Sequence, residues 1–152
     1  MKLLKLSHGR ISPALEEPLQ TVSLDEWRDN PQAHADATAL AIPNDASVAD
    51  ITMDICGFDV VILDFPQFKD GRAYSQARLI RERLNFTGEI RARGGVLRDQ
   101  LLFMVRCGFD AFEFGDAGVA DAVLREFTFA YQPAADSVAP IWRQRLAHAK
   151  AA

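Results

Sequence analysis

Arginine and carboxylate side chains gather in one stretch of the chain, between Lys69 and Arg106. Nine basic residues stand there against four acidic ones, a balance of +5, whereas the rest of the chain carries −9. Guanidinium groups bind phosphate-like oxyanions and carboxylates through paired hydrogen bonds. The stretch therefore indicates a site for a small oxyanion. Its basic residues are Lys69, Arg72, Arg78, Arg81, Arg83, Arg91, Arg93, Arg98 and Arg106.

Two of these arginines stand next to turns that could hold an anion. Residues 89–92 are expected to form a short strand, whose alternation places Arg91 and Arg93 on the same face. Arg93 is followed by Gly94-Gly95, which lets backbone N–H groups converge on an anion where a helix begins. Arg72 stands in a DGR turn at the start of the preceding helix. The predicted anion site, for phosphate, sulfate or sulfite, comprises Arg72, Arg93, Gly94, Gly95 and Val96.

The same residues also allow a purely structural interpretation. Arg72 can pair with Asp70 or Asp64, and Arg93 can pair with Asp99, in which case the remaining arginines are solvated. If the protein is an enzyme, Asp64 and Asp70 are its candidate catalytic residues, because both follow the end of an expected strand. The spacing of the carboxylates selects no metal ion.

Other catalytic chemistries have less support in the sequence. His8, His34 and His148 all lie in terminal or connecting segments, which disfavours acid–base catalysis by histidine. The chain has no GxGxxG motif, no P-loop and no Ser/His/Asp set. Its two cysteines are too few for a disulfide framework, and an iron–sulfur cluster usually needs four. The sequence therefore leaves the cofactor unknown.

The composition is that of an ordinary globular domain. The chain has 152 residues, of which 49% are hydrophobic and 25% charged, and this length suits one domain. No apolar segment approaches the roughly 18 residues of a membrane span, and the N-terminus does not read as a signal peptide. We therefore expect a cytoplasmic protein without membrane contact. A pI near 5.3 gives no global basic field for nucleic acid, so the basic stretch would act on a small anion or an acidic protein partner.

The positions of the elements follow from hydrophobic periodicity. From residue 38 onward strands and helices alternate, which is typical of a parallel sheet with crossover helices. Residues 3–11 predict a hairpin that turns at His8-Gly9, and Ser23 and Glu26 have the spacing of a capping box at a helix start. We expect strands at 39–42, 59–63, 89–92 and 109–114, and helices at 48–55, 73–84, 97–107 and 119–127.

These elements predict one α/β domain, with an N-terminal extension over 1–37, a βα core over 38–130 and a tail over 131–152. Four βα units make a small parallel sheet that is either open or similar to half of a (β/α) barrel, because the length excludes a full barrel. An open sheet has free edges, which the N-terminal segments or a second copy of the protein could cover. A homodimer is therefore one of the assemblies that we consider.

A four-residue repeat supports this order of elements. Cys56-Gly57-Phe58-Asp59 recurs as Cys107-Gly108-Phe109-Asp110, each time between an expected helix and an expected strand. The glycine is the residue that caps a helix in the left-handed conformation. Both repeats would lie at the edge of the sheet opposite the predicted anion site. We expect Cys56 and Cys107 to be small buried residues of the last helical turn.

The second half of the chain also carries a set of residues that resembles a known family. The set includes Phe65-Pro66, Phe68, Asp70-Gly71-Arg72, Ser75-Gln76-Ala77-Arg78, Leu84, Gly88, Arg91-Ala92, Arg98-Asp99-Gln100 and Arg106-Cys107-Gly108-Phe109-Asp110, with weaker matches at Tyr131-Gln132-Pro133 and Trp142-Arg143. This set resembles the most characteristic block of short proteobacterial proteins identified as probable oxidoreductases involved in sulfite reduction. Where that family more often has an acidic residue, this chain has Gly95, which eases an amide nest.

The resemblance implies a role in sulfur assimilation, because genes of that family tend to lie beside the gene for assimilatory sulfite reductase. Three hypotheses follow. In the first hypothesis, the protein is an accessory of sulfite reduction that binds the reductase or its oxyanion. In the second, it is an enzyme that holds an oxyanion or phosphorylated substrate with Arg72 and Arg93. The third hypothesis is a non-catalytic scaffold whose basic face docks an acidic partner.

Overall fold

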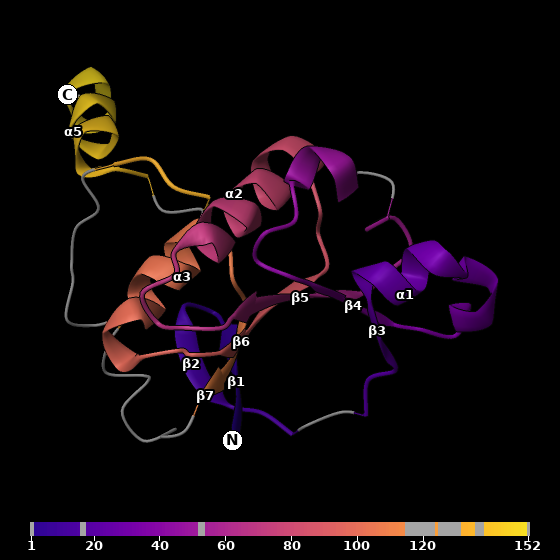
Figure 1. Cartoon of the computed structure of the whole chain (residues 1–152). Coiled ribbons are helices and arrows are strands. Elements are labelled where there is room, and N and C mark those ends of the chain that lie inside the picture. Colours follow the sequence, from indigo (N-terminus) through magenta and orange to yellow (C-terminus); the bar gives the residue numbers. More distant parts are fainter. Residues whose placement is uncertain are drawn as a thin grey trace.

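Five parallel strands follow one another across the sheet in the order of the sequence. The computed structural model describes residues 2–15, 18–51, 54–114, 124, 132–135 and 139–151. In these residues one seven-stranded sheet has the order β2-β1-β7-β6-β5-β4-β3, in which β3 to β7 are parallel and β1 is antiparallel to both of its neighbours (Figure 1). The strands are β1 (Lys2–Ser7), β2 (Arg10–Pro13), β3 (Thr21–Ser23), β4 (Ala39–Ile42), β5 (Val60–Phe65), β6 (Glu89–Gly94) and β7 (Ala111–Phe114).

The helices and helical turns complete the α/β fold that the sequence predicts. Figure 1 shows α2 and α3 together above the sheet, where they pack against each other. Because the parallel strands are in sequential order, right-handed crossovers place the connections on one face. The elements are α1 (Leu24–Asp29), η1 (Pro31–His34), η2 (Val48–Ile51), α2 (Arg72–Leu84), η3 (Arg98–Gln100), α3 (Leu101–Cys107) and α5 (Ile141–Ala151).

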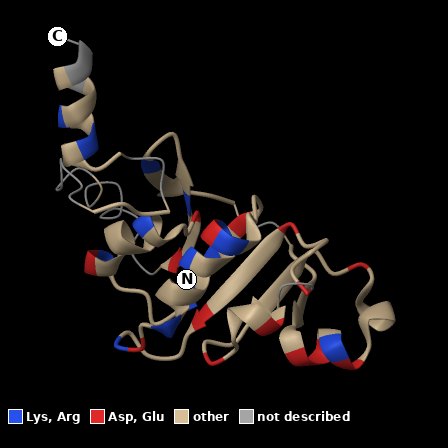
Figure 2. Cartoon of the chain, turned by 90° about the horizontal axis from the view of Figure 1, so that it is seen from above, with Lys and Arg blue, Asp and Glu red and all other residues tan. Residues whose placement is uncertain are grey.

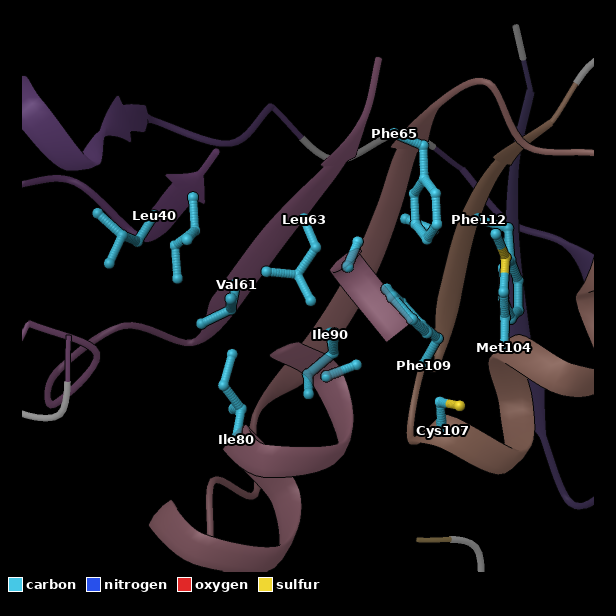
Figure 3. Close-up of a cluster of buried hydrophobic side chains, with 14 of the residues drawn as sticks. Leu40, Val61, Leu63, Phe65, Ile80, Ile90, Met104, Cys107, Phe109 and Phe112 are labelled. Carbon is cyan, nitrogen blue, oxygen red and sulfur yellow. The ribbon is translucent and has the colours of Figure 1, made fainter. Parts of the chain in front are cut away.

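The main core lies between the sheet and the helices. Every second side chain of the central strands points to this face, and Figure 3 shows Val61 and Leu63 of β5 beside Ile80 of α2. Phe65, Phe109 and Phe112 are at most 1% exposed. On the opposite face a second, smaller cluster of buried residues comprises Ala39, Ala41, Val60 and Ile62, with Leu19 packed against it. Each face of the sheet thus buries apolar side chains, and α2 and α3 pack on the face of the larger cluster.

Several local predictions are confirmed. The N-terminal hairpin turns at His8 and Gly9, which both have positive φ. The N–H of Glu26 donates to Ser23 Oγ, and Glu26 Oε2 accepts from the Ser23 N–H at 3.0 Å, so α1 begins with the expected capping box. Gly57 and Gly108 of the two CGFD repeats have φ of 106° and 104°, in the left-handed region.

Other predictions are wrong or only partly right. In place of the predicted helix 48–55, the described residues of this range form the 3-10 turn η2. Val48 and Ile51 of this turn are buried, and so is Ile55 after it, so the apolar spacing reports burial and not helix length. The parallel strand β3 was not predicted, because a three-residue strand has too few side chains to show alternation. Cys56 is exposed, although it was expected to be buried like Cys107. The predicted helix 119–127 lies outside the described residues, apart from Leu124.

Arg81 connects α2 to the turns on either side of it. Its guanidinium donates to the carbonyl oxygens of Phe86 at 2.6 Å, Gly88 at 2.7 Å and Gly108 at 3.0 Å, and forms an ion pair with Asp110. The Asp110 carboxylate also accepts from the N–H of Ile90 at 2.9 Å. Burial raises the pKa of Asp110, against the opposing effects of the Ile90 hydrogen bond and of Arg81. One arginine thus joins the ends of α2 and α3 to the starts of β6 and β7.

We predict that Arg81→Ala lowers the free energy of unfolding by about 3 kcal/mol, because it removes a largely buried cation and leaves three carbonyls without this donor. Urea denaturation followed by circular dichroism measures the change. The matched control is Arg78→Ala on the same helix, whose exposed pair with Glu82 is worth about 0.5 kcal/mol or less. Equal losses in the two variants would contradict this role for Arg81.

Candidate functional site

Charged side chains occupy the face of the sheet that α2 and α3 leave uncovered. On β6 this face carries Glu89, Arg91 and Arg93, because Ile90 and Ala92 point into the main core. Arg93 stands opposite Asp64 of β5, and Arg91 stands between Ile62 of β5 and Ala111 of β7. Charges in the middle of a sheet are costly to bury, so their presence at this position marks the face as a candidate site.

A hollow of about 310 Å³ lies on this face. Its polar lining comes from Thr21 of β3, Arg91 and Arg93 of β6 and Glu113 of β7. Its apolar lining comes from Leu3, Leu19 and Ile62. Four strands separate β3 from β1, so the sheet must be strongly curved for Thr21 and Leu3 to line the same hollow. The hollow therefore occupies the concave side of the sheet, as the interior would in half of a barrel.

Arg91 is the buried cation of the hollow. The residue is 6% exposed, and its Nε and Nη2 donate to Glu89 Oε1 at 2.8 and 2.7 Å. Glu89 Oε2 in turn forms an ion pair of 2.8 Å with Lys5 on β1. Among the described residues no hydrogen bond engages Nη1 of Arg91. The guanidinium is thus held in one orientation while one of its donor groups is left for another acceptor.

Arg93 lies at the carboxyl end of β6 and is half-buried. Its Nε and Nη2 donate to the two carboxylate oxygens of Asp64 at 2.7 and 3.0 Å. The hydrogen bond to Asp64 raises the pKa of Arg93, burial opposes this shift, and the charges of Asp64 and Glu113 add to it. The Asp64 pair leaves Nη1 of Arg93 unused among the described residues. Arg91 and Arg93 therefore line one hollow, each with a fixed carboxylate partner.

Arg72 and Arg93, which were predicted to share an anion, bind different carboxylates. Arg72 donates from Nη2 to Asp70 Oδ2 at 2.7 Å, and Arg93 donates to Asp64. Of the alternative pairings, Arg72 with Asp70 is confirmed, whereas Arg93 pairs with Asp64 and not with Asp99. Sequence alone could not separate these carboxylates, because strand register decides which one stands opposite Arg93. Both catalytic candidates, Asp64 and Asp70, are thus engaged by arginines.

The Gly94-Gly95 turn is closed by backbone hydrogen bonds. The Gly95 N–H donates to Phe65 O at 2.7 Å, and the Val96 N–H donates to Gly94 O at 2.8 Å. An anion at these amides would have to compete with both bonds. A Cβ on Gly94 would lie 2.5 Å from Phe65 O, and one on Gly95 would lie 2.9 Å from the backbone nitrogen of Phe68. The close approach of the turn after β5 thus accounts for both glycines.

The residues of the hollow that sequence reasoning missed are Thr21, Leu3, Leu19 and Ile62, whereas Glu113 was expected among the carboxylates near strand ends. Arg91 was placed on the same face as Arg93, but it was not included in the predicted site. The signal that could have found it is the alternation Glu89, Arg91, Arg93, because a core strand with charges at every second position must face something polar. Thr21 and Leu19 had no such signal, since β3 itself was not predicted.

The two cysteines lie away from the hollow, before the starts of β5 and β7. Among the described residues, no group of three His, Cys, Asp or Glu could hold a metal ion. Within the same residues, no helix combines the length and the apolar character that a membrane span needs.

Fold and site together define a singly wound α/β protein with a charged hollow on the concave face of its sheet. The family model described as "Bacterial protein of unknown function (DUF934)" matches residues 39–142, and the chain belongs to this family. The match begins at β4 and therefore includes β5, β6 and β7, which contribute Ile62, Arg91, Arg93 and Glu113 to the hollow. No curated protein and no solved structure matches the chain.

The pKa of Asp70, in the turn before α2, provides a direct test of the ion pairs at the carboxyl edge of the sheet. The hydrogen bond from Arg72 lowers the pKa of Asp70 from 3.8 to about 2, with further help from Asn44. Because the folded pKa is lowered, the stability that this carboxylate contributes is present above pH 3.8 and is lost as the pH falls towards 2.

We predict that Arg72→Gln raises the pKa of Asp70 towards 3.8, as measured by NMR titration of the carboxyl carbon. Arg78→Gln, which changes an arginine on the same helix that is paired with Glu82, should leave the pKa of Asp70 at its original value. An Asp70 pKa that does not respond to Arg72→Gln would show that Arg72 is not the cause.

Proposed function

We propose that this protein binds the oxyanion group of a small molecule in the concave hollow of its sheet, through Arg91 and Arg93, and that it serves assimilatory sulfite reduction. Sulfite, sulfate and phosphate are the simplest ligands of this kind. The observation that carries the proposal is the presence of two arginines of one strand in a single hollow of about 310 Å³, each with its Nη1 group unused by its carboxylate partner.

The surroundings of the two arginines favour ligand binding over simple structural pairing. Hydrogen bonds are electrostatically stronger in a partly desolvated site than in water. Glu89 and Asp64 orient the guanidinium groups through Nε and Nη2, so a ligand oxygen meets donors that are already positioned. Thr21 adds a hydroxyl group to the polar lining of the hollow.

Arg72 is the less suitable of the two edge arginines that the sequence indicated. It is exposed at the surface, and it binds Asp70 through both Nε and Nη2. The hollow does not include it. We therefore keep Arg93 from the predicted site, add Arg91, and assign Arg72 to the structure of the turn that precedes α2.

The link to sulfite reduction rests on the resemblance of residues 65–110 to probable oxidoreductases whose genes tend to lie beside sulfite reductase. An accessory protein would hold sulfite or a related oxyanion for the reductase, or bind the reductase itself. The accessory role needs only groups that bind charged molecules, and the arginines and carboxylates of the hollow are groups of this kind. We therefore propose the accessory role before the oxidoreductase role.

We predict that isothermal titration calorimetry detects binding of sulfite to the protein, and that Arg93→Ala weakens it about tenfold or more, because it removes one charge-assisted donor. Arg72→Ala is the matched control and should leave binding unchanged. The opposite result, with binding lost in Arg72→Ala and kept in Arg93→Ala, would place the anion at the turn before α2 and refute the assignment to the hollow. Circular dichroism checks that each variant is folded.

We also predict that an in-frame deletion strain grows on sulfide as sole sulfur source but fails on sulfate and on sulfite. This pattern would follow if the protein acts at the reduction of sulfite, because sulfide enters after that step. A plasmid copy of the gene should restore growth, and a copy carrying Arg93→Ala should not. Unimpaired growth on all three sulfur sources would contradict a necessary role in sulfite reduction.

A further inference from the structure

The helix α5 has no buried face among its described residues. Residues 142–147 and 149 are exposed, and Ile141 is only partly buried. Trp142 and Leu146, which are one helical turn apart and share a face, are 46% and 56% exposed. Figure 1 shows α5 standing away from the sheet. Because an isolated helix of eleven residues is only marginally stable in water, a surface that covers Trp142 and Leu146 would stabilise α5.

The charges of α5 are all of one sign. Residues 141–152 contain Arg143, Arg145 and Lys150 and no acidic residue, whereas the rest of the chain carries 14 basic and 21 acidic residues, a balance of −7. In Figure 2 the helix that leads to the C-terminus likewise shows basic segments only. The longest stretch without Lys or Arg is 29–68, which contains seven acidic residues. A surface that complements α5 is acidic, and this chain itself provides such a stretch.

A second pocket, of about 540 Å³, lies at the edge of the sheet where the parallel strands begin, and we call it the edge pocket. Its walls come from residues 55–59, before β5, and from residues 83–88, between α2 and β6. The first wall belongs to the acidic stretch 29–68, and its Asp59 is exposed. A pocket of this volume accepts small organic groups, so it can receive an indole ring. Its apolar residues are Ile55, Phe58, Leu84 and Phe86, and its charged residues are Asp59 and Arg83.

The chain approaches α5 from the same edge of the sheet. Arg106, in the last turn of α3, donates from Nη2 to Gln132 O, and its carbonyl oxygen accepts from the Ala135 N–H at 2.9 Å. The hydrogen bonds of Arg81 place the turn after α3 beside the edge pocket. Because α5 begins six residues after Ala135, it starts within about 20 Å of this attachment. Helix and pocket therefore belong to one side of the molecule.

We propose that α5 of one copy of this protein docks in the edge pocket of a second copy, with Trp142 between the apolar walls and the basic residues of α5 facing the stretch 29–68. No described residue of α5 lines the edge pocket of its own chain. Because each copy supplies one helix and one pocket, the two contacts are equivalent and close a two-fold dimer. This inference does not depend on the proposed function, because the edge pocket and the hollow share no residue.

Sedimentation velocity of the full chain at concentrations up to about 100 μM tests the proposal. We expect a particle of twice the chain mass of 16.8 kDa. Trp142→Ala should weaken the dimer at least tenfold, because a tryptophan inserted in a pocket is a typical hot spot. Phe103→Ala, which truncates an aromatic side chain of similar exposure on α3, is the matched control and should leave the dimer intact. A monomeric wild-type protein, or a dimer that Trp142→Ala does not weaken, overturns the proposal.

Reversal of a single charge tests where α5 docks. Asp59→Lys places a cation in the edge pocket and should also weaken the dimer at least tenfold, because it repels the basic residues of α5. Asp36→Lys makes the same change in the same acidic stretch but outside the pocket, and should change the dimer dissociation constant less than twofold. An effect of Asp59→Lys no larger than that of Asp36→Lys would overturn docking in the edge pocket. Circular dichroism checks that each variant is folded.

Discussion

The sequential order of the parallel strands is the constraint on which this structure depends. Because each crossover is right-handed and leads to the next strand, the crossover helices α2 and α3 cover the same face of the sheet. That face acquires a core of large apolar side chains, whereas on the other face the described residues form only a small apolar cluster beside the hollow. Curvature then brings β3 and β1 around the same hollow. The main hydrophobic core and the candidate site thus lie on opposite faces of one sheet.

The strand β6 shows how one segment serves both sides. Ile90 and Ala92 are fully buried against the helices, while Arg91 and Arg93 carry the charges of the hollow. Changing the register of β6 by one residue would exchange these roles and bury two cations in the apolar core. Position 91 therefore accepts an arginine only because Glu89, two residues earlier on the same face, supplies its partner.

Arginine plays different parts in this chain because its surroundings differ. Arg81 is saturated by carbonyl groups and Asp110, which makes it a structural connection between turns. Arg78 lies on the solvent side of α2 and contributes one exposed pair. Arg91 and Arg93 are oriented by carboxylates but are not saturated by them. The residue type is the same in all of these cases, so the packing distinguishes a structural arginine from a candidate site residue.

The sequence by itself determined the α/β class, the strands β4 and β6, the helix α2, the hairpin and the capping box at Ser23, because each depends on periodicity or on contacts within a few residues. It also placed Arg91 and Arg93 on one face. Only the tertiary structure decided that Arg93 meets Asp64, that β3 joins the sheet, and that Thr21 reaches the same hollow as Leu3. Those facts depend on register, strand order and curvature, which act between residues far apart in the chain and leave no local pattern.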